Sequence, residues 1–186
     1  DVKGDVLFIV AGGGRVSGSS LAIMQYLKGH NISVLYIKPD RTFLGNEAKI
    51  LDNMAFGVFQ EYARSGVFER LYLVDNTVLE EILPEVSIKN YFDNLNEAIV
   101  STIHMLNVFN HTKPITDTFS ELPIATRITT FGIVNPEKNE DNVFFPLDNV
   151  TDVRYYYAYS QERVEKSKKL LSEIKNDIKS KMTDEI

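Results

Sequence analysis

The stretch that decides the fold reads Val6-Leu-Phe-Ile-Val-Ala-Gly-Gly-Gly-Arg-Val-Ser-Gly-Ser-Ser20. Its first five residues, Val6 to Val10, form a continuous apolar run, which is typical of a parallel strand covered on both faces. Gly12, Gly13 and Gly14 follow, and they allow a backbone path that side chains would block. Ser17 to Ser20 then offer caps and unhindered amides at the start of a helix, where phosphate binds readily. The stretch predicts a nucleotide phosphate site, and the alternative is a tight strand-to-helix turn that binds nothing.

The rest of the chain alternates between helical and strand patterns. Helical spacing of apolar residues predicts helices at residues 21–28, 46–65, 78–83 and 88–110. Short apolar or β-branched runs predict strands at residues 32–37, 70–74 and 127–134. A strand, a glycine turn, a helix and a second strand make a βαβ unit, so the sheet should be parallel with right-handed crossovers. We therefore expect an α/β fold with a Rossmann-like parallel sheet.

A long central helix should separate this sheet from part of a smaller α+β domain. The helix at 88–110 carries more apolar residues than an exposed helix needs, so we expect it to be largely buried. The helix at 46–65 should pack through Ile50, Leu51, Met54, Phe59 and Tyr62. A tyrosine-rich strand at 153–159 and a lysine-rich helix at 160–182 close the chain, the helix packing through Val164, Leu171, Ile174 and Ile178. The expected domains are residues 1–110 and 111–186.

Composition excludes several classes of function. The chain has 186 residues, 44% of them hydrophobic, and a net charge of −6, which argues against a general nucleic-acid surface. Cysteine is absent, so neither disulfides nor thiolate metal sites form. No apolar run reaches the length of a membrane span. The first residues lack the basic and apolar regions of a signal peptide, and the sequence does not start with methionine. We expect a cytoplasmic protein seen from an internal starting point.

Two common phosphate loops fit the glycine stretch poorly. Counting from Gly13 gives the Walker spacing, but Ser19 stands where that motif has its lysine. A Rossmann fingerprint starting at Gly12 has Ser17 in place of its third glycine, with Asp40 available as an acid for the ribose. The dinucleotide interpretation therefore stays open as a weaker alternative.

A third comparison fits better. Gly12-Gly-Gly-Arg-Val-Ser-Gly18 resembles the tubulin and FtsZ signature Gly-Gly-Gly-Thr-Gly-Ser/Thr-Gly at five of seven positions. Four more segments agree in order and spacing over roughly the first 110 residues: "DVLFIVAG", "VLYIKP", "LVDN" and "YFDNLNEAI". The chain is similar to divergent phage or plasmid members of this superfamily such as TubZ. The resemblance implies the second half of a tubulin-type GTPase domain that binds GTP or GDP, with Mg²⁺, and polymerises head to tail.

The resemblance also implies which residues hold the nucleotide. The phosphates would be held by Gly12, Gly13, Gly14, Ser17 and Gly18, with Arg15 as an added cation. Ribose and guanine would be recognised by Asn76 and Asn96, because an amide offers both a donor and an acceptor, and Phe92 would stack on the base. The alternatives are a turn residue for Asn76, a surface residue for Asn96 and a core residue for Phe92.

In this superfamily an acidic loop after the central helix completes the GTPase site of the next subunit. The corresponding residues here are 114–121, so Asp117 and Glu121 are the candidates to position the attacking water. Their spacing departs from the Asn-x-Asp-x-x-Asp pattern of the family, and helix capping is the alternative role.

Two departures affect the expected activity. Arg15 and Val16 replace a threonine and a glycine of the signature. The first glycine-rich loop of the family would precede Asp1, so we expect an internal piece of a larger protein with part of the nucleotide site. The leading hypothesis is a GTP-binding, filament-forming protein whose GTP hydrolysis is completed between subunits. The alternatives are a catalytically inactive structural relative and, more remotely, a Rossmann dinucleotide-binding enzyme.

Overall fold

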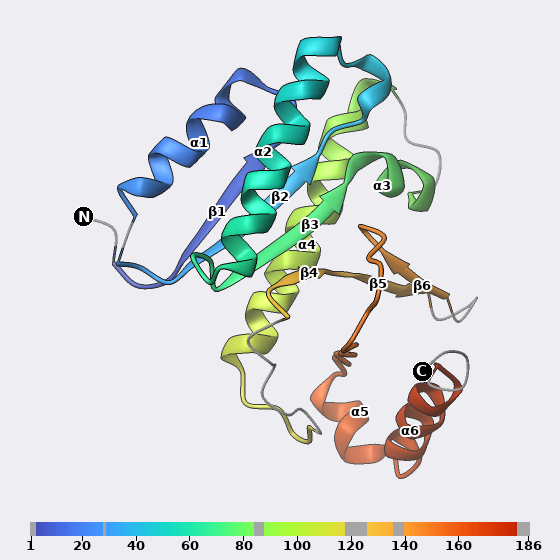
Figure 1. Ribbon diagram of the computed structural model, residues 1–186. Coiled ribbons are helices and arrows are strands. Elements are labelled where there is room, and N and C mark those ends of the chain that lie inside the picture. The colour runs from blue at the N-terminus through green and yellow to red at the C-terminus, as the bar shows by residue number, and fades with distance from the viewer. Residues whose placement is uncertain (1–2, 28, 84–87, 118–125, 136–139, 182–186) are drawn as a thin grey trace. The chain divides into compact units, whose positions relative to one another are not determined.

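The computed structural model describes residues 3–27, 29–83, 88–117, 126–135 and 140–181. The chain forms two compact units, Asp1–Asn149 and Val150–Ile186. The first unit contains a sheet with helices on both faces (Figure 1). The division after residue 110 that the family resemblance implies stays a prediction.

The sheet of the first unit is parallel, as the sequence predicts. Its strands are β1 (Val6–Ala11), β2 (Ile32–Lys38), β3 (Arg70–Asp75) and β4 (Ile128–Thr130), in the spatial order β1-β2-β3-β4. Val6 pairs with Ile32 and Ser33 with Arg70, so the first three strands begin level with one another. An α/β fold with a four-stranded parallel sheet is therefore confirmed, and it is compatible with a Rossmann-like arrangement.

Helices cover the two faces of the sheet because side chains alternate along each strand. On one face, α1 (Arg15–Gln25) and α2 (Asn46–Arg64) share a core with Val34 and Tyr36 of β2. On the other, α3 (Asn76–Ile82) and α4 (Tyr91–His111) share a core with Leu35 of β2. Short 3-10 turns, Arg41–Phe43 and Ile88–Asn90, precede α2 and α4.

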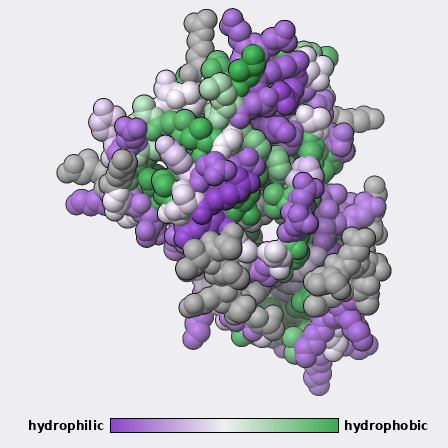
Figure 2. Space-filling view, viewed as in Figure 1, coloured by the Kyte–Doolittle hydropathy of each residue, from purple (hydrophilic) through white to green (hydrophobic). Residues whose placement is uncertain are grey.

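The buried stripe of α2 differs from the predicted one. Phe59 is buried as expected, but Ile50, Leu51 and Met54 are 58%, 46% and 65% exposed. The buried residues are Asp52, Ala55, Phe59 and Ala63, which recur at helical spacing on a neighbouring side of the helix. The polar Asp52 hides this stripe in the sequence. Hydrophobic residues therefore reach the surface among hydrophilic ones in the first unit (Figure 2).

The expectation that the long helix is largely buried is wrong. Only Leu95 and Ile99 of α4 are buried, while Phe92 and Val100 are 70% and 57% exposed. The helix packs one stripe on the core that contains Leu35 and Val74, where Ile103 and Leu106 are partly buried, whereas Phe92 and Val100 are exposed. Among the described residues, none of the helices has the length and apolar character needed to cross a bilayer.

The predicted strand at 127–134 is divided in two. β4 ends at Thr130, and after Phe131 the chain forms β5 (Gly132–Asn135), which pairs antiparallel with β6 (Glu140–Val143). A Cβ on Gly132 would clash with the backbone of Asn142, so glycine allows the close approach of the two strands. Phe144 returns to the parallel sheet, where its carbonyl accepts a hydrogen bond of 2.8 Å from the amide of Asp75.

The second unit also departs from its prediction. Residues 151–160 form no strand, and the single predicted helix is two, α5 (Gln161–Lys166) and α6 (Leu170–Lys181). The Tyr157 hydroxyl donates to Asp177 Oδ2 at 2.6 Å, and Lys181 Nζ lies 5.0 Å from the centre of the Tyr155 ring. Tyr155 and Tyr157 therefore contact the last helix instead of a neighbouring strand. Of the predicted stripe, Leu171 is exposed, and Leu170 beside it is buried.

Candidate functional site

The carboxyl ends of β1, β2 and β3 lie together at one end of the sheet (Figure 1). Ala11 pairs with Ile37, and Lys38 pairs with Asp75, so the residues that follow these strands share one edge. Ligands of open α/β sheets bind outside this edge. Because neighbouring strands lie about 4.8 Å apart, the glycine turn after β1 and Asn76 after β3 are separated by roughly 10 Å across the sheet. A nucleoside triphosphate spans such a distance.

The three glycines after β1 have three different roles. A Cβ on Gly12 would clash with Asp52 Oδ1 and lie 2.6 Å from the Tyr36 hydroxyl, so the packing beneath the turn requires glycine there. Gly13 has a φ of 73°, a backbone conformation that side chains disfavour. Gly14 is the N-cap of α1, makes no side-chain cap bond, and has open space where a Cβ would lie. Because Gly14 has no side chain, the residue at the N-cap does not cover the first backbone amides of α1.

The start of α1 differs from the prediction. The helix begins at Arg15, six residues before the predicted start, so the serines lie within it instead of capping it. Ser17 and Ser20 are buried, and their hydroxyls donate to Gly14 O at 2.5 Å and Val16 O at 3.2 Å. Gly18 lies in the second turn with no atom near its Cβ position. The groups best placed to meet a phosphate are therefore the first backbone amides of α1, not the Ser17 hydroxyl.

Asn76 carries an unexplained polar atom. It is the first residue of α3, and its side-chain oxygen Oδ1 is buried with no hydrogen-bond partner. Its neighbours are occupied: the Asp75 carboxylate accepts from the Thr77 amide at 2.9 Å and lies 3.6 Å from Lys38 Nζ. A buried acceptor left unpaired costs about 1–3 kcal/mol and calls for a physical explanation. A ligand N–H at the edge of the sheet would supply the missing bond.

Phe92 and Asn96 lie on the first turns of α4. They are four residues apart, so they share one side of the helix, and both are exposed. The Phe92 ring contacts the Tyr91 ring edge-on, with 5.0 Å between ring centres, and the Tyr91 hydroxyl donates to Glu80 Oε2 of α3 at 3.3 Å. This bond ties the start of α4 to α3, the helix that Asn76 begins. The alternative role of Phe92 as a core residue does not fit this exposed ring, and its predicted stacking on a base stays a prediction.

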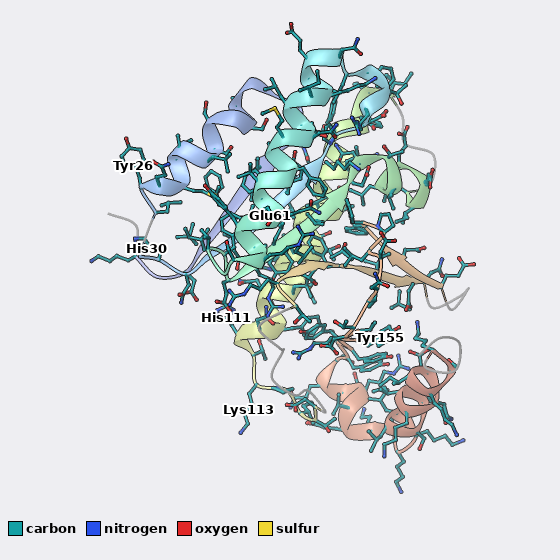
Figure 3. The ribbon with its side chains drawn as sticks, viewed as in Figure 1. Tyr26, His30, Glu61, His111, Lys113 and Tyr155 are labelled. Atoms are coloured by element: carbon teal, nitrogen blue, oxygen red, sulfur yellow. The ribbon has the colours of Figure 1, made fainter. Side chains whose placement is uncertain are left out.

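The acidic loop lies at the other end of α4. His111 and Lys113 mark the end of this helix that is remote from the glycine turn (Figure 3). The 21 residues of α4 span roughly 30 Å at about 1.5 Å per residue. Asp117, four residues further on than Lys113, is exposed. Glu121 lies outside the described residues. The end of α4 that precedes Asp117 therefore lies far from the glycine turn of the same chain.

Beneath the glycine turn lies a buried polar pair that the sequence did not reveal. The Tyr36 hydroxyl donates to Asp52 Oδ1 at 2.6 Å, and the two residues are 0% and 1% exposed. Burial raises the pKa of Tyr36 above its ordinary value, and the hydrogen bond to Asp52 and the charge of Asp52 raise it further. The sequence signal for this pair is the position of Asp52, which lies at helical spacing from the buried Ala55 and Phe59 of α2. Its partner is 16 residues away, so only the fold brings them together.

Asp40, the acid that the dinucleotide interpretation assigns to the ribose, has a local structural role. The Asp40 carboxylate accepts a hydrogen bond of 2.8 Å from the Thr42 amide and so caps the 3-10 turn Arg41–Phe43. Hydrogen bonding to Thr42 lowers the pKa of Asp40.

No protein-family model matches the chain, and no match to a curated protein or to a solved structure is found. The function therefore has to be inferred from the site.

Proposed function

We propose that the chain binds a guanine nucleotide at the carboxyl edge of its sheet and assembles head to tail, in the manner of the tubulin and FtsZ superfamily. The observation that carries this proposal is the unpaired, buried Oδ1 of Asn76, across the sheet from the glycine turn. A hydrogen-bond donor from a ligand would satisfy this acceptor. Guanine offers its N2 amino group as such a donor.

The rest of the nucleotide has suitable partners at the same edge. The uncovered amides at the start of α1 suit the phosphates, because they carry unpaired N–H groups and the positive end of the helix dipole. The exposed Phe92 ring suits stacking on the base, an interaction that any base can make. Asn96 suits hydrogen bonding to the ribose or to the edge of the base. Arg15 is proposed as an added cation for the phosphates. In the described residues, no cluster of three acidic or histidine side chains fits a metal ion, so Mg²⁺ would arrive with the nucleotide.

The position of Asp117 supports assembly. This exposed carboxylate follows His111 and Lys113, which lie at the end of α4 remote from the sheet's carboxyl edge (Figure 3), so we propose that it approaches the nucleotide of a neighbouring subunit. Head-to-tail stacking would place it above the phosphates of the next chain, where a carboxylate can orient water for attack on phosphorus. Glu121 is proposed for the same role.

A second candidate is an assembly that binds the nucleotide without hydrolysing it. Arg15 and Val16 replace the signature threonine and glycine, and the Ser17 hydroxyl is bound to Gly14 O. These features favour binding more than turnover.

Sedimentation separates the candidates. We expect the purified protein to pellet in GTP with Mg²⁺ and to remain in the supernatant in GDP. Phosphate release that is lost in Asp117→Asn, with pelleting retained, supports hydrolysis between subunits. Pelleting without phosphate release supports the inactive assembly. Protein that binds no GTP and never pellets contradicts the proposal.

A further inference from the structure

The buried Asp52 carboxylate packs directly against the glycine turn, and the proposed function leaves it unused. Its Oδ1 occupies the space that a Cβ on Gly12 would need, so it lies within about 4 Å of the Gly12 Cα. The side chain is 1% exposed and therefore poorly screened by solvent. None of the ion pairs among the described residues includes Asp52.

Tyr36 fixes the carboxylate in this place. Its hydroxyl donates to Asp52 Oδ1 at 2.6 Å, and its ring packs against Phe56 and Phe59 with 5.4 Å between ring centres in each case. The hydrogen bond satisfies one oxygen of the carboxylate but does not cancel its charge. Lys38, the last residue of β2, is engaged with Asp75 at 3.6 Å.

We propose that Asp52, held by Tyr36, places a negative charge beneath the phosphate-binding turn. This charge lowers the affinity of the site for the nucleotide and makes that affinity depend on a cation that neutralises the phosphates. This inference rests on the proposed function, and it adds a residue that sets the affinity of the same site. A phosphate bound by the first amides of α1 lies roughly 6–8 Å from the carboxylate, by ordinary hydrogen-bond lengths. Repulsion at that distance reduces affinity by about 10- to 50-fold for each unit charge on the phosphate.

The biological consequence is an exchangeable site. A free polyphosphate, which carries its full charge, is repelled most strongly, and a phosphate neutralised by Mg²⁺ is repelled least. The turn would therefore select the magnesium complex of the nucleotide over the free anion. It would also release the nucleotide readily when the cation leaves.

Asp52→Asn tests the inference, because asparagine has nearly the same shape and keeps an oxygen to accept the Tyr36 hydroxyl. We expect calorimetric titration with GTP to show a Kd at least about 10-fold lower for this variant in EDTA. The gain should be clearly smaller in excess Mg²⁺. Glu61→Gln is the matched control: it removes a negative charge from the same helix at an exposed position, 71% accessible and far along α2 (Figure 3). Its Kd should equal that of the wild type.

Tyr36→Phe keeps the charge and removes the hydrogen bond, so it should not tighten binding. If Asp52→Asn fails to fold, the double variant Tyr36→Phe/Asp52→Ala removes the charge without leaving a buried polar group unpaired and should also bind GTP more tightly in EDTA. Equal or weaker binding in a folded variant without the charge overturns the inference, and so does a gain that is the same with and without Mg²⁺. Failure of every protein to bind any nucleotide overturns the proposed function as well.

Discussion

Replacing Asn76 with leucine should stabilise the protein and weaken its binding of GTP. Leucine is close to asparagine in shape and removes the buried Oδ1 that has no hydrogen-bond partner in the free protein. An unpaired buried acceptor costs about 1–3 kcal/mol, so we expect Asn76→Leu to raise the free energy of unfolding by about 1–2 kcal/mol. The corresponding rise in Tm is about 3–6 °C for a unit of this size. Urea unfolding without nucleotide measures the change directly.

The same substitution removes the proposed partner of the guanine amino group. Loss of that bond, with an apolar side chain facing the donor, should raise the Kd for GTP by about 10- to 100-fold. Asn53→Leu is the matched control, because Asn53 is exposed on α2 and its replacement should change stability by less than about 0.5 kcal/mol. A destabilised Asn76→Leu protein would show that the oxygen is paired in solution. Unchanged GTP affinity would show that Asn76 does not contact the base.

The remaining predictions concern the glycine turn and the pair beneath it. Gly14→Trp should abolish nucleotide binding while the circular dichroism spectrum stays native, because the Cβ position is open, and retained affinity would show that this turn does not hold phosphate. Gly12→Ala should lower the free energy of unfolding by about 1–3 kcal/mol, since its Cβ would clash with Asp52, whereas Gly18→Ala should raise it by up to about 1 kcal/mol in an open helical position. The folded-state pKa of Tyr36 lies above its ordinary value of 10.0, so the wild type should lose stability relative to Tyr36→Phe as the pH rises above that value. Unfolding curves that keep the same difference from pH 8 to 11 would refute this last prediction.

The sheet could be predicted because its signals are local. Each of β1, β2 and β3 is a short apolar run between turn residues, and α2 begins and ends within a residue of its expected bounds. The start of α1 was missed because serines are good caps, whereas here Gly13 turns the chain so that Gly14 caps the helix directly. Capping preferences describe averages over many helices, and they do not account for the positive φ of Gly13 in this turn.

Other features depend on contacts between residues distant in sequence. Ile50, Leu51 and Met54 were predicted to pack, and Asp52 was not among the predicted buried residues of this helix, because its partner Tyr36 is on another element. The tyrosine-rich segment had strand composition but found no partner strand, and strand formation requires one. Asn76 was predicted as a site residue by position. Its unpaired oxygen became visible only with its neighbours in place.

Competition between nucleotides tests the central claim most directly. A fluorescent GTP analogue bound to the wild-type protein is displaced by unlabelled GTP, ITP, ATP or NAD⁺ at equilibrium. We predict that GTP competes best, that ITP, which lacks the amino group proposed to meet Asn76, competes at least about tenfold less well, and that ATP and NAD⁺ are weaker still. Equal displacement by GTP and ATP, stronger displacement by NAD⁺, or no binding of the analogue would contradict a guanine nucleotide site at this edge.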